Sequence, residues 1–204
     1  MLKKENMKVY PSTEVSEMTD GLKEAVADYR EWRNFNPEFY IEKKIAKLNS
    51  YLRDCGLDSI VVAISGGIDS AIVLSLVQKA QQKENSPIKA VFPLLLPSNH
   101  GVSFQDEATK KGRELCTHLG LSSSVVEMSP IVQSIRDGLE PNCGLATDDW
   151  AIGQLVAYAR TPVLYYMTSL ISANGGSGII CGTTNLDEGS YLGYVGKASD
   201  GMVD

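Results

Sequence analysis

The sequence predicts an open, parallel α/β sheet, doubly wound and flanked by helices. Four short apolar runs rich in β-branched residues alternate with helical patterns, and they span residues 60–64, 90–96, 124–128 and 178–181. This alternation is typical of parallel sheets whose crossovers are helices. Glycine turns directly follow the first and the last run. Since ligands of such sheets bind beyond the carboxyl ends of the strands, we expect both turns at the ligand-binding edge.

The polar start of the chain is expected to lie outside the sheet domain. Residues 1–36 are polar and mixed, whereas a helical pattern of apolar residues begins near Pro37 and stops before Gly56. We therefore predict an N-terminal extension over 1–36, packed on something else, and a main domain over 37–204.

The first half of the main domain predicts a strand, a glycine turn and a helix in succession. Ile60–Ile64 is apolar on both faces, as in a buried parallel strand. A helix that is apolar nearly all round follows over about 69–82. The second strand region contains Pro93, which argues against a regular strand there. Ser103 then opens a helix that Gly120 ends.

The second half predicts two helical regions between the third strand and the fourth. The third strand is expected over 124–128 and a short helix over 130–138. Residues 147–149 are capping residues for a longer helix that runs towards Ala173. Pro162 is expected to kink or break that helix.

Composition and charge argue against several classes of partner. The 204 residues carry a net charge of −6, so the chain lacks the positive field that draws proteins onto nucleic acid or an anionic membrane. No apolar run approaches the ~20 residues that span a bilayer. The four cysteines lie far apart, with no C-x-x-C pair. This spacing predicts reduced thiols and a cytoplasmic protein.

The segment Ser65-Gly-Gly-Ile-Asp-Ser70 joins the first strand to its helix. Its glycines let backbone N–H groups point into one concavity, and the helix N-terminus adds partial positive charge. The segment lacks the G-x-G-x-x-G pattern of dinucleotide sites and the G-K-[ST] ending of a Walker A loop. We interpret it as a phosphate-binding loop, with a plain glycine turn as the alternative.

With a serine at each end and an Asp at the helix start, this segment resembles the PP-loop of the ATP pyrophosphatases, which adenylate a substrate and release pyrophosphate. Two later segments, Cys181-Gly-Thr-Thr-Asn-Leu-Asp-Glu188 and Gly193–Asp204, resemble the two signatures of NAD synthetases. Together with Leu94–Ser98, the resemblance covers residues 37–204. It implies an adenine-nucleotide alpha-hydrolase-like fold and a homodimer.

The resemblance implies a ligase that converts nicotinic acid adenine dinucleotide (deamido-NAD) to NAD. The substrate carboxylate would attack the α-phosphorus of ATP, pyrophosphate would leave, and ammonia would then displace AMP from the acyl-adenylate. Mg²⁺ would bridge phosphate oxygens. The residues before Ile60 are too few for a glutaminase domain. We therefore expect the nitrogen donor to be ammonia, free or supplied by a separate chain.

The same resemblance assigns site residues one by one. ATP would be bound by Ser65, Gly66, Gly67, Asp69, Ser70 and Thr183. Mg²⁺ would be held by Asp69 and Glu188, because a hard cation prefers carboxylates. The alternatives are a helix N-cap or first-turn acid for Asp69, and a first-turn helix acid or solvated surface residue for Glu188. The dinucleotide would be bound by Arg160, Lys197 and Asp200, and the expected catalytic residues are Asp69, Glu188 and Lys197.

Some positions depart from the family pattern. Gln154, Tyr158 and Pro162 are unusual around the Arg, and Gly196 is unusual before the Lys. Two alternatives therefore stay open: another amide-forming ligase with a PP-loop, and a non-catalytic nucleotide-binding module.

The family domain is longer than this chain, and Asp204 matches a position inside it. We therefore expect the C-terminal part of the domain to be missing here. On that basis the chain alone should bind ATP but turn over poorly, with residues 190–204 weakly ordered or held by a partner.

Overall fold

The fold is known from a computed structural model, which describes residues 19–33, 36–99, 104–185 and 188. The chain forms two compact units, residues 1–40 and 41–204. In the described part no helix is long and apolar enough to cross a membrane.

The N-terminal unit contains a helix that the sequence analysis did not predict, α1 (Asp20–Arg33). Leu22, Tyr29 and Trp32 are exposed on it, and the rings of Tyr29 and Trp32 stack with centroids 5.9 Å apart. The spacing of Leu22, Val26 and Tyr29 follows a helical period. It is inconspicuous in the sequence because charged residues surround it.

The second unit is built on a parallel sheet of four strands in the order β3-β2-β1-β4. The strands are β1 (Ser59–Ala63), β2 (Ala90–Leu95), β3 (Ser124–Val125) and β4 (Gly178–Cys181). The chain runs outwards from β1 to β3 and returns to the other side of β1, which places the topological switch point between β1 and β4. The predicted fold class is confirmed.

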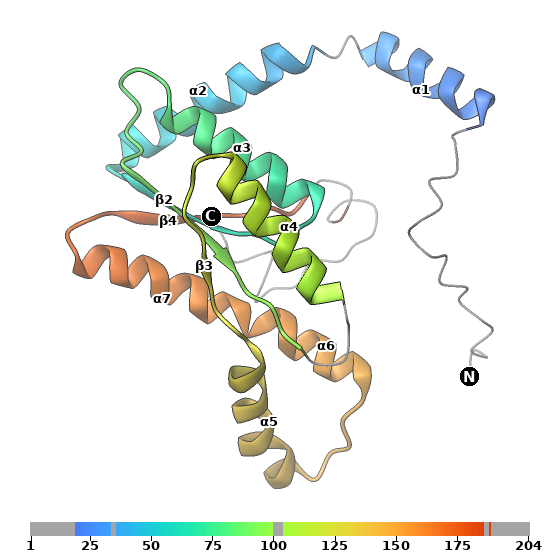
Figure 1. The fold of residues 1–204 in the computed structure, drawn as a ribbon, viewed down its shortest axis with the longest axis vertical. Helices are drawn as coiled ribbons and strands as arrows, with labels where there is room; N and C mark the ends of the chain where they lie inside the picture. The colour runs from blue at the N-terminus through green and yellow to red at the C-terminus, as the bar shows by residue number, and fades with distance from the viewer. Residues whose placement is uncertain (1–18, 34–35, 100–103, 186–187, 189–204) are drawn as a thin grey trace. The chain divides into compact units, whose positions relative to one another are not determined.

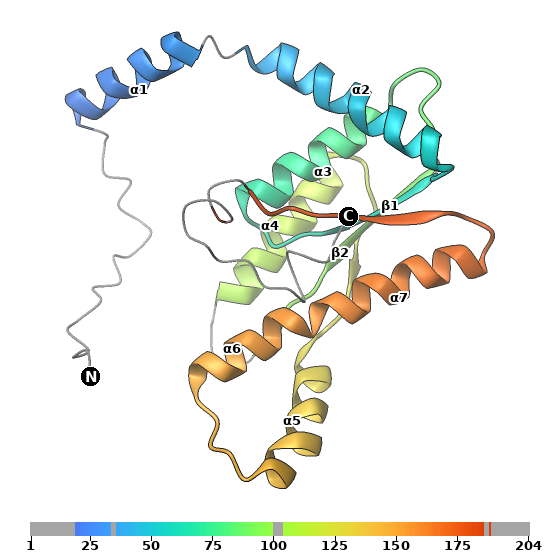
Figure 2. The same cartoon turned by 180° about the vertical axis from the view of Figure 1, so that it is seen from behind.

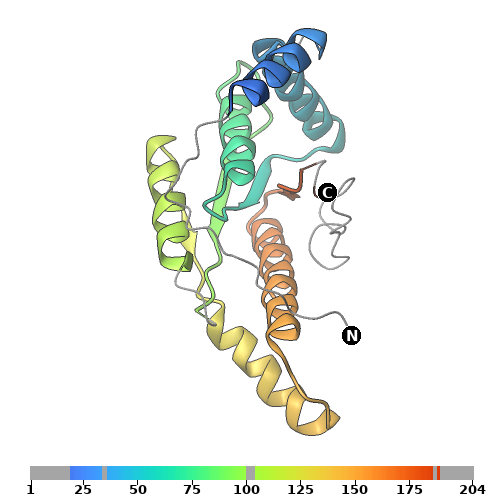
Figure 3. The ribbon, with the colours of Figure 1, turned by 90° about the vertical axis from the view of Figure 1, so that its right-hand side faces the viewer.

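Helices cover both faces of this sheet, as Figure 3 shows for α4 and α7 on opposite sides of the strands. The helices of this unit are α2 (Pro37–Cys55), α3 (Ile68–Gln81), α4 (Phe104–His118), α5 (Ser129–Cys143), α6 (Asp149–Tyr158) and α7 (Arg160–Ala173). The helix α3 packs on β1 and β2, and α7 packs on β1 and β4. Figures 1 and 2 show α7 running along the sheet on the face away from α3.

The hydrophobic core of this unit consists of two buried clusters, and alternate residues of β1 belong to different clusters. Ile60 and Val62 join a buried cluster with α2, α3 and α4, whereas Val61 joins a second cluster with α5 and α7. This period of two explains why the strand sequence is apolar without a break, because both of its faces are buried.

Pro93 is buried inside β2, which stays regular, contrary to the expectation. The Ile64 N–H donates to the Leu94 carbonyl at 2.8 Å, so the backbone of Leu94 faces β1 and that of Pro93 faces the opposite side. There β3 begins only at Ser124, opposite Leu94. The N–H that proline lacks therefore breaks no hydrogen bond of the sheet.

Three other elements differ from the predicted boundaries. The strand β3 covers two residues, where 124–128 was predicted. The helix α5 continues past Gly138 to Cys143, since the left-handed stop comes at Gly144 (φ 64°). The last long helix is divided at Ala159, so Pro162 falls in the first turn of α7, where its missing N–H is tolerated.

Candidate active site

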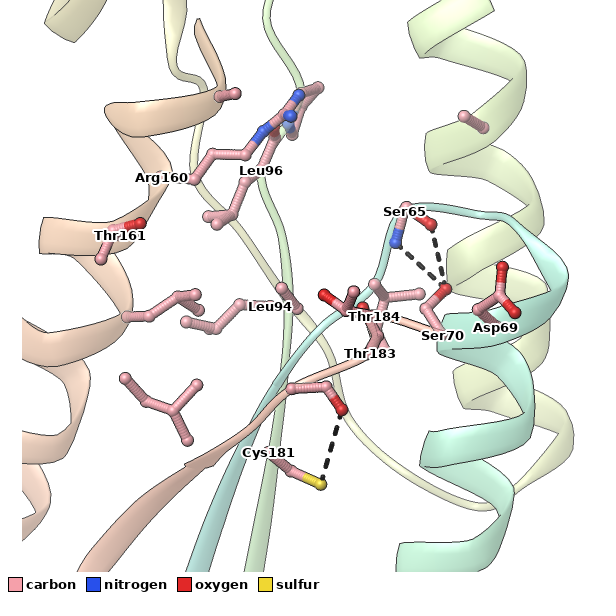
Figure 4. Close-up of a pocket in the computed structure, with 18 of the residues that line it drawn as sticks. Ser65, Asp69, Ser70, Leu94, Leu96, Arg160, Thr161, Cys181, Thr183 and Thr184 are labelled. Carbon is pink, nitrogen blue, oxygen red and sulfur yellow. Dashed lines mark hydrogen bonds between the residues drawn. The ribbon is translucent and has the colours of Figure 1, made fainter. Parts of the chain in front are cut away.

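A pocket of about 540 Å³ lies at the carboxyl ends of the strands. Its walls come from the segment after β1, the segment after β4, the start of α3 and the start of α7, with further residues from β2 and α4. Figure 4 shows Ser65, Asp69 and Ser70 on one side of this space and Arg160 on the other. The two turns that were expected at the ligand edge do meet here, because β1 and β4 are neighbours in the sheet.

The loop after β1 is shaped by two glycines in different conformations. Gly66 has a φ of +80°, which L-residues with a side chain rarely adopt. Gly67 is extended (φ −91°, ψ 170°) and serves as the N-cap of α3 without a side-chain cap. No capping side chain therefore occupies the backbone N–H groups at the start of α3, whose first residues Asp69 and Ser70 line the pocket, as an anion site requires.

The two serines of the loop have different surroundings. The Ser70 side chain is 1% exposed, and its hydroxyl accepts from the Ser65 N–H at 3.3 Å and donates to the Gly67 carbonyl at 3.1 Å. Ser65 is exposed, and its Oγ accepts from the Gly67 N–H at 3.2 Å. Ser70 thus holds the loop's shape, while Ser65 is the hydroxyl that a ligand reaches first.

The helix α4 forms part of the pocket, which the sequence analysis missed. Gln105, Ala108 and Thr109 line it, and a Cβ on Gly66 would lie 2.4 Å from the Ala108 carbonyl oxygen. The double glycine was the available signal, since a residue without Cβ permits close backbone approach. The sequence could not show which element approaches.

Asp69 and Glu188 line the same pocket. Within the described residues the Asp69 carboxylate makes no hydrogen bond or ion pair, although Asp69 is half-buried in the first turn of α3. Glu188 exchanges two hydrogen bonds with Asn185: Glu188 Oε2 accepts from the Asn185 N–H at 3.0 Å, and Asn185 Oδ1 accepts from the Glu188 N–H at 2.9 Å. The other Glu188 oxygen, Oε1, has no hydrogen bond to any described residue.

These oxygen donors fit a divalent cation such as Mg²⁺. Mg²⁺ is commonly held by one or two carboxylates together with substrate phosphates and water, without a full protein cage. Accordingly, the described residues contain no group of three or more acidic, His or Cys side chains that could hold a metal. Two carboxylates match the smaller ligand set of one or two carboxylates with phosphates and water. Among the described residues, the Asp69 carboxylate has no partner and Glu188 Oε1 accepts no hydrogen bond.

The segment after β4 contributes Gly182, Thr183 and Thr184 to the pocket wall. Cys181 also lines it, and burial raises the pKa of its thiol. A thiol with a raised pKa is protonated at neutral pH and is therefore a poor nucleophile. The chemistry of this wall is thus provided by hydroxyl and backbone groups.

Arg160 lines the pocket from the start of α7, across from Ser65, Asp69 and Ser70 (Figure 4). Its Nε donates to the Leu96 carbonyl at 3.2 Å, just beyond the end of β2. Burial lowers the pKa of the guanidinium, but arginine remains protonated in proteins. Within the described residues no carboxylate pairs with it. A half-buried cation without a carboxylate partner favours an anionic ligand.

The acids without a predicted role are structural. Asp148 caps α6 by accepting from the Ala151 N–H at 2.8 Å, as the sequence predicted for this region. Glu127 accepts from Asn99 and Ser129 and so ties the segment after β2 to the start of α5. Lys197 and Asp200 lie outside the described residues.

Comparison with known proteins agrees with this geometry. The family model described as NAD synthase matches residues 40–204. The NH(3)-dependent NAD(+) synthetase of Pyrococcus horikoshii is 31% identical over 163 residues, which is 80% of this chain and 56% of the relative. That of Thermoplasma acidophilum is 32% identical over 164 residues, 79% of this chain and 60% of the relative. The chain therefore spans little more than half the length of these relatives.

Solved structures show the same fold. The NH3-dependent NAD synthetase from Campylobacter jejuni, in complex with the nitrate ion, superimposes with a TM-score of 0.66 at 23% identity, covering 81% of this chain and 64% of the other. The NMN synthetase from Francisella tularensis gives 0.67 at 25% identity, covering 83% and 63%. With the family model matching most of its length, the chain belongs to the NAD synthase family.

Proposed function

We propose that this chain carries the ATP-dependent step of NAD synthesis: amidation of deamido-NAD to NAD with ammonia. The substrate carboxylate attacks the α-phosphorus of ATP, which releases pyrophosphate and forms an acyl-adenylate. Ammonia attacks the acyl carbon, AMP leaves, and the ammonium nitrogen loses a proton. Family membership and the curated relatives support the product, and the pocket supports the chemistry.

The observation that carries the proposal is the pocket itself. One space brings together the two serines of the loop after β1, the threonines after β4, two carboxylates and a half-buried Arg. The loop supplies N–H groups and the positive end of α3 to the polyphosphate. Arg160, on the far side, is placed to pair with a substrate phosphate or carboxylate. The substrate carboxylate and ATP are both anions, so their reaction needs positive groups on both sides of the reacting atoms.

Residues of the loop have separate tasks in this proposal. Ser65, Gly66 and Gly67 bind the leaving pyrophosphate, Ser70 keeps the loop in shape for it, and Thr183 contacts ATP from the other wall. Asp69 and Glu188 would hold Mg²⁺, which when bound neutralises charge on phosphate oxygens. Lys197 and Asp200 stay predicted contacts of the dinucleotide.

The test replaces Asp69 and measures binding and turnover separately. Asp69→Asn keeps the shape of the side chain and removes its charge, so NAD formation should fall by about 100-fold or more, while ATP binding measured by calorimetry should change much less. Asp149→Asn is the matched control, because Asp149 is a first-turn acid of α6 outside the pocket. Unchanged turnover in Asp69→Asn would contradict the metal assignment.

A pyrophosphate-release assay distinguishes the alternatives. Release that requires deamido-NAD supports the proposal, whereas release with another acid supports a different PP-loop ligase, and no release supports a nucleotide-binding module. Deamido-NMN is a necessary arm, because a similar fold belongs to an NMN synthetase. Ammonia and glutamine should be compared in the same assay, with ammonia the expected donor.

We further propose that the protein is a homodimer and cytoplasmic. Large apolar side chains are exposed on α5–α7: Leu139 (60%), Trp150 (73%) and Tyr166 (65%). Such a surface fits association with a second copy. Sedimentation at micromolar concentration should show a dimer, and Tyr166→Glu should weaken it. All four cysteines are free, which supports the proposed reducing compartment.

A further inference from the structure

The turn between β4 and Glu188 holds a pair of reciprocal hydrogen bonds. The Asn185 N–H donates to Glu188 Oε2 at 3.0 Å, and the Glu188 N–H donates to Asn185 Oδ1 at 2.9 Å. This is the hydrogen-bond pattern of a capping box, with Asn in place of the usual Ser or Thr. Both residues are half-buried. Glu188 lines the pocket, whereas Asn185 does not.

These bonds restrict what the Glu188 carboxylate can do. Oε2 accepts from the Asn185 backbone N–H, and among the residues that the structure describes none donates a hydrogen bond to Oε1, which leaves that oxygen for a ligand. The hydrogen bond also restricts the rotamers of the Glu188 side chain before a cation binds. An unrestrained glutamate would lose this conformational entropy on binding, so the restrained side chain loses less. Asp69 differs, because its carboxylate has no partner among the described residues.

We propose that Asn185 is a positioning residue: through Glu188 it presents a single, pre-oriented carboxylate oxygen to the divalent cation of the site. The inference rests on the proposed function, because it needs a cation at Asp69 and Glu188. Partners that orient metal ligands typically change metal affinity 10- to 100-fold when removed. The Asn185 backbone N–H holds the Glu188 carboxylate, and the Asn185 side chain holds the Glu188 backbone N–H and so fixes the point from which the Glu188 side chain extends. Because substitution removes only the second bond, an effect at the low end of this range, about tenfold, is expected.

The test measures cation affinity without turnover. Melting temperature is recorded against Mg²⁺ concentration at a fixed concentration of α,β-methylene-ATP, an analogue that cannot release pyrophosphate. Asn185→Ala removes Oδ1 and should raise the Mg²⁺ midpoint about tenfold. Asn185→Ser retains a capping oxygen and should return the midpoint to within about twofold of the unmodified chain. Glu188→Gln can still accept from the Asn185 N–H but carries no charge, so the Mg²⁺ midpoint should rise at least as far as in Asn185→Ala, with Asp69 and the phosphates as the remaining ligands.

Further controls separate positioning from stability. Melting without nucleotide or Mg²⁺ reports the loss of the cap by itself. Asn185→Gly also lacks Oδ1 but costs little stability as an N-cap, so it replaces Asn185→Ala if that variant does not fold. An unchanged midpoint in the Ala or Gly variant, failure of the Ser variant to restore it, or an unchanged midpoint in Glu188→Gln would each overturn the inference. NAD formation is measured separately, so failure of the proposed reaction is distinguishable from failure of the positioning role.

Discussion

Gly66 is the residue at which one added methyl group should do the most damage to the loop. In Gly66→Ala the new Cβ would lie 2.4 Å from the Ala108 carbonyl oxygen and 2.9 Å from the Ala108 carbonyl carbon and Cα. These are backbone atoms of α4, so no side-chain rotation relieves the contact. In addition, the φ of +80° costs a residue with a Cβ about 1–2 kcal/mol.

The two effects together predict a loss of about 3 kcal/mol or more, because the loop or α4 must also shift. For a chain of this size, that corresponds to a fall in melting temperature of about 6–12 °C. Gly67→Ala is the matched control. Its φ is −91°, and a Cβ there would meet only the Ser65 Oγ, at 3.3 Å. Because alanine is a poorer N-cap than glycine by up to about 1 kcal/mol, the control should melt within about 4 °C of the unmodified chain.

Calorimetry or circular dichroism gives both melting temperatures, and fluorescence titration with ATP gives binding. Gly66→Ala should lose ATP affinity along with stability, since the loop's N–H groups move with its backbone. Equal melting temperatures for the two variants would refute the argument that the close approach of α4 requires a glycine. Normal ATP binding in a destabilised Gly66→Ala variant would show that ATP binding does not depend on the loop conformation that Gly66 provides.

Two further predictions concern stability. The pKa of Asp58 is lowered to about 2, first by its hydrogen bond from Lys89 and then by the Ser177 N–H. The ionised Asp58 should therefore stabilise the folded chain fully above about pH 4–5, and this stabilisation should disappear as the pH falls towards 2. Its size should be about 1–2 kcal/mol, because Lys89 is exposed. Urea unfolding of Asp58→Asn across this range checks it, and parallel pH profiles for the two proteins would contradict it. Gly112→Ala places a Cβ 2.6 Å from Leu95 Cδ2 and should destabilise the fold by about 1–3 kcal/mol. Gly138→Ala, with nothing within 4 Å of the new Cβ, should stabilise the fold by about 0.5–1 kcal/mol. If Gly112→Ala melted at a higher temperature than Gly138→Ala, packing at α4 would not be tight.

The sheet was predictable from the sequence because its central strand is buried on both faces. Ile60–Ile64 has to be apolar throughout, and β4 begins and ends at the predicted residues Gly178 and Cys181. The length of β3 was not predictable, since edge pairing depends on the backbone of β2 and not on the side chains of 124–128. The length of α5 was also predicted wrongly, because the sequence-based prediction ends the helix at Gly138. Gly138 does not adopt the left-handed conformation that ends a helix, and a side chain there would meet nothing within 4 Å.

The candidate site was predictable where backbone geometry creates it and less so where long-range contacts do. The loop after β1 and the turn after β4 meet because parallel neighbouring strands end at one edge. The approach of Ala108 to the loop, the hydrogen bond from Arg160 to Leu96, and the burial of Ser70 depend on packing between distant segments. Such contacts leave only indirect marks in the sequence, as the double glycine does.

The register of β1 and β4 connects the far end of the sheet to this site. Asp58 accepts from the Ser177 N–H at 2.9 Å, and its carbonyl accepts from Lys89 at 2.7 Å, so one residue joins the starts of β1, β2 and β4. A slip of one residue between β1 and β4 would displace Thr183 relative to Ser65 by about 3.3 Å and turn the side chains of β4 to the wrong faces. The two walls of the pocket are therefore aligned by hydrogen bonds at the opposite end of the strands. The geometry of this candidate site therefore depends in part on residues that do not line the pocket.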